Sequence, residues 1–301
     1  MNIIKDFDLT PFLTLKTKVV AENYCEPKTR EEIIDLFKNK ANYPQPYFFF
    51  GGGSNLAVLT DKIPGLTIKN NYRQKNIIQE TDQEIILKVS SGYPVSLLVK
   101  EMIDAGYAGL ENQFGLPGTV GGAVYLNSKW MHPLTYISDC LVKAVLIDQN
   151  GNLKEVEKEY FQFAYDYSIL QKTKEIVLEV FFKLKKSDPE ILQEKALATV
   201  EYRKKTQPTG IASSGCFFRN ISDEDKIRLN LPTQSAGYLI DQCGLKGTTS
   251  GNFFVSDKHA NFILNKGQGQ PEDLLKLLEL IKSKVMEKFG VGLKEEVVIV
   301  R

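Results

Sequence analysis

Two glycine-rich turns are the residues of this chain whose types and spacing most clearly suggest chemistry. The first is "GGGSN", residues 51–55, and the second is "GLPGTVGGA", residues 115–123. Glycine lets backbone N–H groups converge without Cβ atoms in the way, which is how main chain can hold a pyrophosphate. Ser54, Asn55 and Thr119 would add side-chain donors. The alternative is that both segments are simply tight turns, which glycine also favours.

Neither turn fits a common nucleotide-binding motif. A P-loop needs a lysine and a Ser or Thr after its second glycine, and neither turn has them; "GLKGTT" at 244–249 has its lysine in the wrong place. A Rossmann fingerprint needs G-x-G-x-x-G inside a βαβ unit, with an acidic residue further on, and neither turn matches it. A dinucleotide bound here would therefore need a different scaffold.

The segments around the turns predict the elements that must position them. "PYFFF" before the first turn and "LAVL" after it read as strands. Residues 94–106 predict a helix, since Pro94 stands at its start and Gly106 at its end. Five glycines between 109 and 122 argue against a long helix there, although a short one beginning near Gly118 fits.

The C-terminal part has a different pattern. A charged, helical stretch from Asp188 to about Lys205 ends at "TQPTG" and indicates a boundary. Residues 271–289 form the clearest helical pattern, with apolar residues at helical spacing and Gly290 at the end. The final "KEEVVIVR" reads as a strand. The sequence therefore predicts an α+β protein in about three subdomains.

Composition excludes several classes of function. The 301 residues carry 38 basic and 37 acidic side chains, so the net charge of +1 creates no field to attract nucleic acid or an anionic membrane. Four scattered cysteines without a C-x-x-C pair, and only two histidines, argue against a metal site or a disulfide framework. The N-terminus lacks the apolar run of a signal peptide, and no long apolar stretch follows. We expect a reduced, cytoplasmic protein without membrane insertion.

Six blocks carry a family resemblance: "FFFGGGSNLAVL", "GLENQFGLPGTVGGAVYLNS", "SSGCFFRN", "AGYLIDQCGLKG", "VSDKHANFILN" and "EEVVIV". Their order resembles that of the UDP-N-acetylenolpyruvoylglucosamine reductase family, the FAD enzymes of peptidoglycan synthesis. The resemblance spans nearly the whole chain. It implies a vanillyl-alcohol-oxidase (PCMH)-type FAD-binding fold in two subdomains, 1–67 and 68–200. A C-terminal α+β substrate-binding domain, 201–301, would follow, and its last strand could pack back on the FAD-binding part.

The resemblance also implies the reaction. NADPH would reduce non-covalent FAD, and the enolpyruvyl ether of UDP-N-acetylglucosamine would then take hydride at one alkene carbon and a proton at the other. Neither glycine turn contains the histidine or cysteine that a covalent flavin link usually uses. The residues expected to hold FAD are Gly51, Gly52, Gly53, Ser54, Asn55, Pro117, Gly118, Thr119, Gly121, Gly122 and Ala123.

Two catalytic residues follow from aligned blocks. The proton-donating serine of the family corresponds to Cys216; a thiol, with an ordinary pKa of about 8.5, is mostly protonated at neutral pH and can do the same work. The alternative is a buried structural cysteine beside Phe217 and Phe218. The glutamate of the family's C-terminal block corresponds to Glu296, as an acid or electrostatic partner. Without the resemblance, a solvated carboxylate next to Glu295 would be the default.

The third catalytic position departs from the family. Where the family has an arginine before an acidic residue and a serine, "FAYDYSIL" places Asp166. A carboxylate there would repel the substrate carboxylate and the developing enolate. Either another cation compensates, with Arg203, Arg219 and Lys246 as candidates, or the chemistry is altered.

A second departure lies in "NSKWMHP", where bulky Trp130 and Met131 replace a run of small residues, so the loop over the flavin is expected to differ. The residues expected on the substrate side are Arg203, Arg219, Asn220 and Gln242, with exposed cations or capping amides as the alternative. His259 has no metal-ligand partner and is predicted to be structural.

Two other functions remain open. The chain could be a catalytically degenerate relative that keeps the FAD or UDP-sugar site as a binding or regulatory module, which Asp166 would explain. It could also be a different flavin oxidase of the same superfamily, although the C-terminal blocks argue against this.

Overall fold

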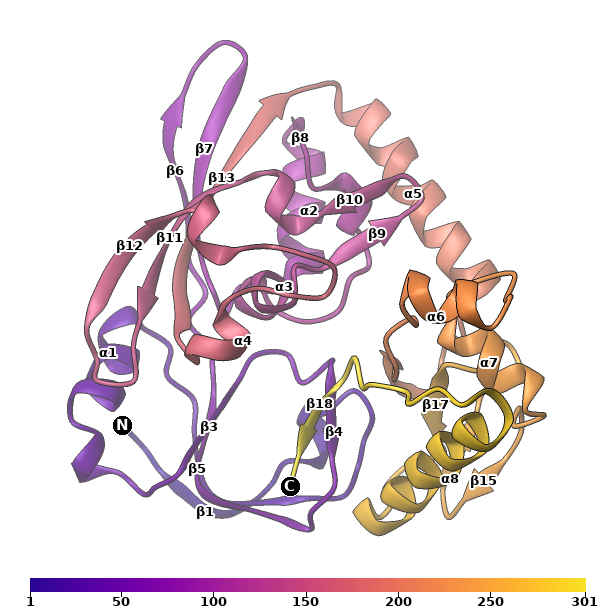
Figure 1. Cartoon of the computed structure of the whole chain (residues 1–301). Coiled ribbons are helices and arrows are strands. Elements are labelled where there is room, and N and C mark those ends of the chain that lie inside the picture. Colours follow the sequence, from indigo (N-terminus) through magenta and orange to yellow (C-terminus); the bar gives the residue numbers. More distant parts are fainter. The chain divides into compact units, whose positions relative to one another are not determined.

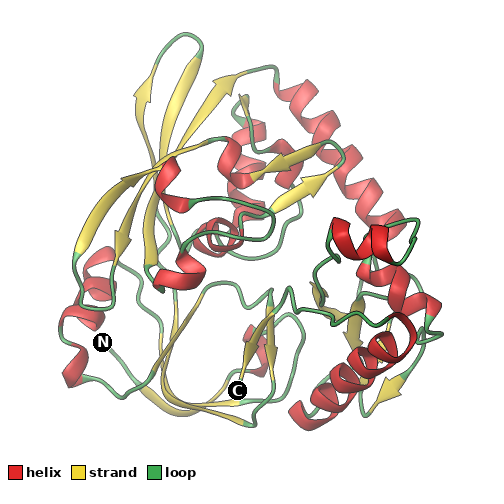
Figure 2. Ribbon diagram, in the orientation of Figure 1, coloured by secondary structure: helices red, strands yellow, loops and turns green.

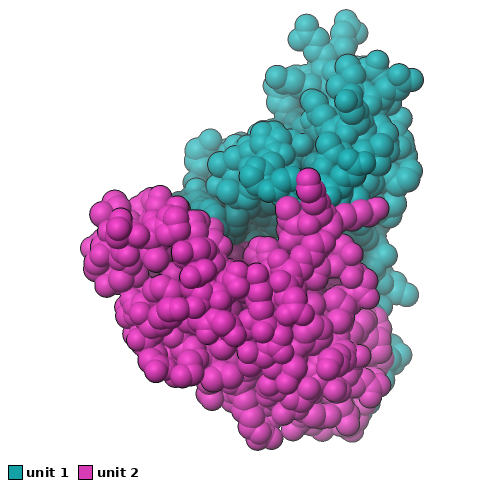
Figure 3. Space-filling view, turned by 90° about the vertical axis from the view of Figure 1, so that its right-hand side faces the viewer, with its two compact units in different colours: residues 1–5, 23–52, 65–203 teal, residues 6–22, 53–64, 204–301 magenta.

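The structure is a computed structural model that describes residues 1–301. It divides into two compact units (Figure 3). Unit 1 comprises residues 1–5, 23–52 and 65–203, and unit 2 comprises residues 6–22, 53–64 and 204–301. Three strands cross from one unit to the other: β1 (Ile4–Asp8), β2 (Val20–Cys25) and β5 (Lys62–Lys69). No helix has the length and apolar character needed to cross a membrane.

Unit 1 is built on an antiparallel sheet in the order β12-β11-β13-β7-β6, with β8 also paired to β13 (Figure 1). The alternation of buried residues along β7, with Ile85, Leu87 and Val89 inward, gives the sheet an apolar face. The strands are β6 (Lys75–Glu80), β7 (Glu84–Ser90), β8 (Tyr107–Ala108), β11 (Leu141–Ile147), β12 (Leu153–Glu157) and β13 (Ile176–Lys186).

Helices cover that apolar face (Figure 2). α2 (Val95–Asp104) and α3 (Val120–Leu126) contribute Leu98, Val99 and Val124 to a core shared with the strands. As the sequence predicts, Pro94 caps the start of α2 and Gly106, at φ +73°, follows its end. Two further helices are α4 (Leu170–Thr173) and α5 (Pro189–Thr206), which leaves unit 1 after Arg203.

A second core of unit 1 lies under α1 (Arg30–Lys38), which begins at the capping box of Thr29 and Glu32. The apolar face of α1 packs with Leu66 and Ile68 of β5, and β3 (Tyr47–Phe50) pairs in parallel with the same part of β5. This pairing places the first glycine turn at the end of β3.

A short hairpin follows α3 directly. Its strands are β9 (Lys129–Met131) and β10 (Leu134–Tyr136), with Lys129 opposite Tyr136 and Met131 opposite Leu134. The bulky residues of "NSKWMHP" therefore form a hairpin of their own. Single 3₁₀ turns occur at Thr10–Phe12, Lys40–Asn42, Glu111–Gln113, Ile137–Asp139 and Lys158–Phe161.

Unit 2 contains an antiparallel sheet in the order β14-β17-β16-β15, and a separate parallel pair formed by β18 and β4. Leucines on one side of α8 pack against this sheet, and Gly290 ends α8 at φ +64° as predicted. The strands are β4 (Leu56–Val58), β14 (Ala212–Cys216), β15 (Thr249–Ser250), β16 (Phe253–Val255), β17 (Phe262–Asn265) and β18 (Val298–Val300). The helices are α6 (Asp223–Arg228), α7 (Ala236–Gln242) and α8 (Pro271–Phe289). The predicted α+β class is confirmed.

Candidate active site

The two glycine turns meet in unit 1. A Cβ atom added to Gly52 would lie 2.5 Å from Cα of Gly118, and one added to Gly51 would lie 2.1 Å from Oγ1 of Thr119. Real Cβ contacts are longer than this, so a side chain at Gly52 would collide with main chain, and one at Gly51 would force the Thr119 hydroxyl to move. The resemblance implies that both turns hold one FAD, and in the structure the backbones of the two turns are in contact.

Hydrogen bonds fix the second turn against the start of α2. Val95 donates its N–H to the carbonyl of Gly118 at 3.1 Å, and Gly121 donates to the carbonyl of Ser91 at 2.8 Å. Gly118 has φ +105°, a backbone conformation that glycine adopts readily. The turn is therefore held in place by main chain on both sides.

The exposed part of this turn suits a diphosphate. Gly122 is exposed, and a Cβ there would meet nothing closer than Oγ1 of Thr119 at 3.7 Å. A ligand can thus approach the main chain, where glycine amides and a threonine hydroxyl offer donors. Pro117 is exposed beside it, whereas Ala123 is buried in the core. These residues fit the diphosphate of FAD.

The rest of the first turn belongs to unit 2. Gly53 lies at φ +63°, and a Cβ there would be 2.3 Å from the carbonyl oxygen of Phe12. The side-chain amide of Asn55 donates to the carbonyl of Glu296 at 3.2 Å, and the backbone carbonyl of Asn55 accepts from the Val298 N–H at 2.9 Å. Asn55, predicted as a cofactor residue, therefore also fastens the segment that carries Glu296.

Cys216 stands at the end of an irregular strand. The pairing of β14 with β17 shifts register between Ser213 and Cys216, and Gly215 has φ +80°. Bulges of this kind redirect side chains and are common beside active sites. Phe217 and Phe218 are fully buried, but Cys216 is only half-buried, which does not fit a buried structural cysteine.

Two of the other cysteines, Cys25 and Cys140, lie in unit 1. Burial raises the pKa of the Cys25 thiol to about 12, and burial does the same for Cys140. Such thiols stay protonated and inert at neutral pH. In unit 2, the segment of Cys216 lies beside the segment that carries Glu296.

Backbone hydrogen bonds bring Glu296 to the Cys216 segment. Glu296 donates its N–H to the carbonyl of Phe217 at 2.8 Å, and Arg219 donates to the carbonyl of Lys294 at 2.8 Å. Glu295 forms an ion pair with Lys282 of α8.

Asn261 holds the same segment from the other side, a role that the sequence analysis missed. Its side-chain oxygen accepts from Phe218 N–H at 2.9 Å, and its amide donates to the Phe218 carbonyl at 2.8 Å. Its own carbonyl accepts from Phe217 N–H at 2.9 Å. The signal in the sequence was the asparagine of "HANF". An asparagine side chain both donates and accepts, so it can bond the N–H and the carbonyl of one residue.

The predicted substrate residues of unit 2 lie around α7. The side-chain oxygen of Asn220 accepts from Ala236 N–H at 3.3 Å, at the start of the helix. Gln242 is the last residue of α7, and its carbonyl accepts from Lys288. Lys246 pairs with Asp241 at 2.7 Å. Asn220 and Lys246 thus make the kind of capping and ion-pair contacts that were the alternative to a substrate role.

Arg203 lies in unit 1, on α5. Its guanidinium carbon is 4.6 Å from the centroid of the Trp130 ring, within cation–π range. Tyr202 meets the same indole edge-on at 5.6 Å between centroids. Burial lowers the pKa of the guanidinium, and its Nε atom is buried without a hydrogen-bond partner. The unusual hairpin thus holds an arginine with unused donor capacity.

The cation beside Asp166 is Lys129, which the sequence analysis did not consider. Asp166 is buried and accepts from the Lys129 ammonium, which lies 3.9 Å from the centroid of the Tyr165 ring. Lys129 belongs to the segment "NSKWMHP", so the two departures from the family pattern are in contact. Neither segment alone contains a signal that predicts the pair.

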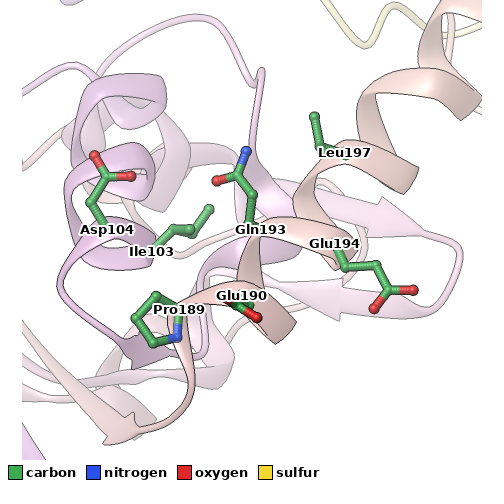
Figure 4. A pocket seen from close by; sticks show the side chains of 7 residues that line it. All are labelled: Ile103, Asp104, Pro189, Glu190, Gln193, Glu194 and Leu197. Atoms are coloured by element: carbon green, nitrogen blue, oxygen red, sulfur yellow. The ribbon is translucent and has the colours of Figure 1, made fainter.

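The hollow shown in Figure 4 does not coincide with the glycine turns. It lies between the C-terminal end of α2 and the start of α5, and the glycine turns contact the N-terminal end of α2. Its carboxylates would repel a diphosphate. The lining residues are Ile103, Asp104, Pro189, Glu190, Gln193, Glu194 and Leu197.

Comparisons with known proteins find matches over nearly the whole chain. Residues 21–157 match an FAD binding domain, and residues 207–300 match the C-terminal domain of UDP-N-acetylenolpyruvoylglucosamine reductase. The chain is 34% identical to the reductase of that name from Chlamydia trachomatis serovar L2 over 299 residues, covering 99% of this chain and 96% of the relative. Identity to the Bacillus pumilus reductase is 33% over 300 residues, covering 99% and 94%.

A solved structure is similar over the same length. The crystal structure of UDP-N-acetylenolpyruvylglucosamine reductase from Thermus caldophilus matches with a TM-score of 0.79 and 30% identity, covering 100% of this chain and 98% of that one. The FAD-binding fold predicted from the sequence is therefore confirmed.

Proposed function

The chain belongs to the UDP-N-acetylenolpyruvoylglucosamine reductase family, and we propose that it reduces UDP-N-acetylglucosamine enolpyruvate to UDP-N-acetylmuramate with FAD and NADPH. This reaction supplies a peptidoglycan precursor in the cytoplasm. The observation that carries the proposal is the pairing of the Cys216 and Glu296 segments in unit 2. The second half of the reaction needs a proton donor and a cationic or acidic partner for the substrate carboxylate.

FAD would be held at the contact between the two glycine turns. Gly51, Gly52, Gly118 and Thr119 form the contact, and the exposed main chain at Gly122 offers room for the diphosphate. We also assign Gly53, Ser54, Asn55, Pro117, Gly121 and Ala123 to this cofactor site. FAD, when bound, carries hydride from NADPH to the substrate alkene.

Cys216 would supply the proton. Hydride addition to one alkene carbon leaves an electron pair on the carbon that bears the carboxylate, and that carbon must take a proton to complete the reduction. A half-buried thiol at the end of a bulged strand can donate it, and Sγ is left as a thiolate that solvent reprotonates. Glu296 on the adjoining segment would act as an acid or electrostatic partner.

We assign Arg203, Arg219, Asn220 and Gln242 to substrate binding. Arg203 has a buried Nε without a partner, so an anionic ligand would complete its hydrogen bonding. We further propose that residues 1–67 and 68–200 bind FAD and that residues 201–301 bind the substrate.

The test is NADPH oxidation by the purified, yellow protein. The proposal expects the rate to rise when UDP-N-acetylglucosamine enolpyruvate is added, with one UDP-N-acetylmuramate formed per NADPH. Bound FAD without substrate-dependent turnover would contradict it. That second result fits a degenerate binding or regulatory module, which the carboxylate at position 166 favours.

A further inference from the structure

The hollow of Figure 4 has a mainly apolar lining with carboxylates at its sides. It measures about 560 Å³ and lies in unit 1, between the C-terminal end of α2 and the first half of α5. Ile103, Pro189 and Leu197 supply carbon atoms to the lining, and Asp104 and Glu194 lie on opposite sides of it (Figure 4). Walls from only two helices leave much of a small ligand in water, whereas good ligand pockets enclose most of it. The hollow therefore suits a protein surface better than a small molecule.

The helix α5 carries apolar side chains on two sides. Leu192 and Ala196 are fully buried in the core of unit 1. Ile191 and Leu197 lie outside that core and are 50% and 49% exposed. A helix on the surface of a protein usually has one apolar stripe, and its opposite side is polar. The second apolar side of α5 therefore has no partner within this chain.

Two carboxylates lie between the exposed apolar side chains. At 3.6 residues per turn, Glu190 and Glu194 fall on the side of α5 that lies between Ile191 and Leu197. They are four residues apart, a spacing at which like charges repel each other on a helix. Neither forms an ion pair, whereas Asp104 across the hollow is paired with Lys100. This side of α5 therefore lacks the cations that would balance it.

The charge decides which occupant fits. Nucleic acid and anionic membranes carry phosphates, which Glu190 and Glu194 would repel. A second copy of the chain that bound through the same face would bring the same carboxylates together, since a two-fold interface joins a surface to itself. A protein segment that has lysine or arginine on either side of an apolar side chain complements both the carboxylates and the apolar lining.

We propose that this face of α5, formed by Glu190, Ile191, Glu194 and Leu197 together with the hollow, binds a basic amphipathic helix of another protein. An apolar side chain of the partner enters the hollow beside Ile103, and its cations pair with the two carboxylates. The face extends over two turns of α5, about 10 Å, which matches a short helix. This interaction goes beyond the reductase activity, because none of these residues belongs to the proposed FAD or substrate site.

A synthetic peptide tests the inference. The probe is a rhodamine-labelled amphipathic helix of about four turns, with leucine on one side and lysine on the other, and the control peptide has glutamate in place of lysine. Fluorescence anisotropy with the FAD-loaded protein should show saturable binding of the lysine peptide that weakens as salt is added. The glutamate peptide should bind at least about tenfold more weakly, since like charges then meet.

Variants of the chain locate the binding. The double variant Glu190→Gln with Glu194→Gln should weaken binding of the lysine peptide about fivefold, because two exposed ion pairs are lost. Leu197→Ser should weaken it by a similar factor, because an apolar contact is lost. Glu279→Gln is the matched control, since it removes an exposed carboxylate from α8 of unit 2 and should leave the affinity unchanged. Flavin absorbance and the melting temperature verify that each variant is folded.

Carbodiimide coupling identifies the site independently, because it forms an amide between a carboxylate and a nearby amine. Mass spectrometry should find the lysine peptide attached to Glu190 or Glu194. Attachment spread evenly over exposed carboxylates would overturn the inference, as would absence of binding or equal affinity in the wild type and the double variant. Self-association of the chain that Leu197→Ser abolishes, measured by analytical ultracentrifugation, would overturn it in favour of a second copy.

Discussion

The neighbourhood of Cys216 and Glu296 in unit 2 is assembled by backbone, whereas the Lys129–Asp166 pair in unit 1 is assembled by side chains. The Cys216 segment is held by backbone hydrogen bonds to Glu296 and Lys294 and by the side chain of Asn261. The pair in unit 1 depends on the charges of its two members. The two neighbourhoods therefore tolerate sequence change in different ways.

This difference explains which residues can be exchanged. A position that main chain holds keeps its place when its side chain changes, so a cysteine can stand where the family has a serine. A charge held by another charge can move to a different strand, provided that its partner changes too. Lys129 and Asp166 form such a pair of charges.

The largest effect is expected at Cys216. Cys216→Ala should slow reoxidation of the NADPH-reduced flavin by UDP-N-acetylglucosamine enolpyruvate by about 10²- to 10⁴-fold, the usual contribution of a general acid. Cys216→Ser should stay within about tenfold of the wild type, since the backbone keeps the donor in place. Stopped-flow absorbance measures both rates. Wild-type reoxidation by the alanine variant would show that the proton comes from elsewhere.

Asn261→Ala tests the backbone assembly itself. The buried N–H and carbonyl of Phe218 would both lose their side-chain partner, and the free energy of unfolding should fall by about 2–4 kcal/mol. Urea denaturation measures it. Asn252→Ala is the matched control, because the Asn252 amide makes an exposed bond to Gly267 and should contribute little. Equal losses of unfolding free energy in the two variants would show that Asn261 does not hold the Cys216 segment in place.

Gly52→Ala tests the contact between the glycine turns. Its Cβ would lie 2.5 Å from Cα of Gly118, and such crowding costs about 1–3 kcal/mol. FAD affinity, measured by fluorescence titration, should fall by about tenfold or more. Gly292→Ala is the control, because its Cβ would meet only the flexible end of Met286 at 3.6 Å. Unchanged FAD affinity in Gly52→Ala would argue against this site.

Trp130→Ala tests the contact between the Trp130 ring and Arg203 in unit 1. Loss of the ring that lies against Arg203 removes a cation–π contact worth about 0.5–2 kcal/mol. The KM for the UDP-sugar should rise by about 2- to 30-fold with kcat little changed, and Trp130→Phe should recover part of the loss. A fall in kcat at constant KM would assign Trp130 a different role.

The smallest expected effect is the contribution of His259, in unit 2, to the pH dependence of stability. Burial, with a smaller contribution from Lys246, lowers the pKa of His259, so the folded protein binds this proton less tightly than the unfolded chain does. The contribution of His259 is therefore fully present above pH about 6.5 and is lost as the pH falls below that value. Thermal melting between pH 5 and 8 should show a shallower acid decline for His259→Gln. Identical pH profiles would contradict a buried neutral imidazole.

Much of the fold could be predicted because local chemistry marks its elements. Proline and glycine punctuate α2 and α8, and the capping box of Thr29 starts α1. The glycine turns were also visible, since a cluster of glycines marks either a tight turn or a close approach of main chain. The assignment of Cys216 and Glu296 came from the family resemblance, and the structure places their segments together.

The remainder depended on contacts between distant parts of the chain. Lys129 and Asp166 lie in different elements, and nothing in either segment alone shows that they pair. The register shift before Cys216 and the double hydrogen bond of Asn261 likewise arise only when strands from separate segments are aligned. The two compact units are discontinuous in sequence, so composition could not reveal them.

The most direct test of the central claim is an anaerobic stopped-flow record of flavin absorbance in the wild-type protein. The flavin is first reduced with one equivalent of NADPH and then mixed with UDP-N-acetylglucosamine enolpyruvate. The account predicts rapid reoxidation and one equivalent of UDP-N-acetylmuramate. Flavin that stays reduced after mixing would contradict the reductase function and leave the chain as a binding relative of the family.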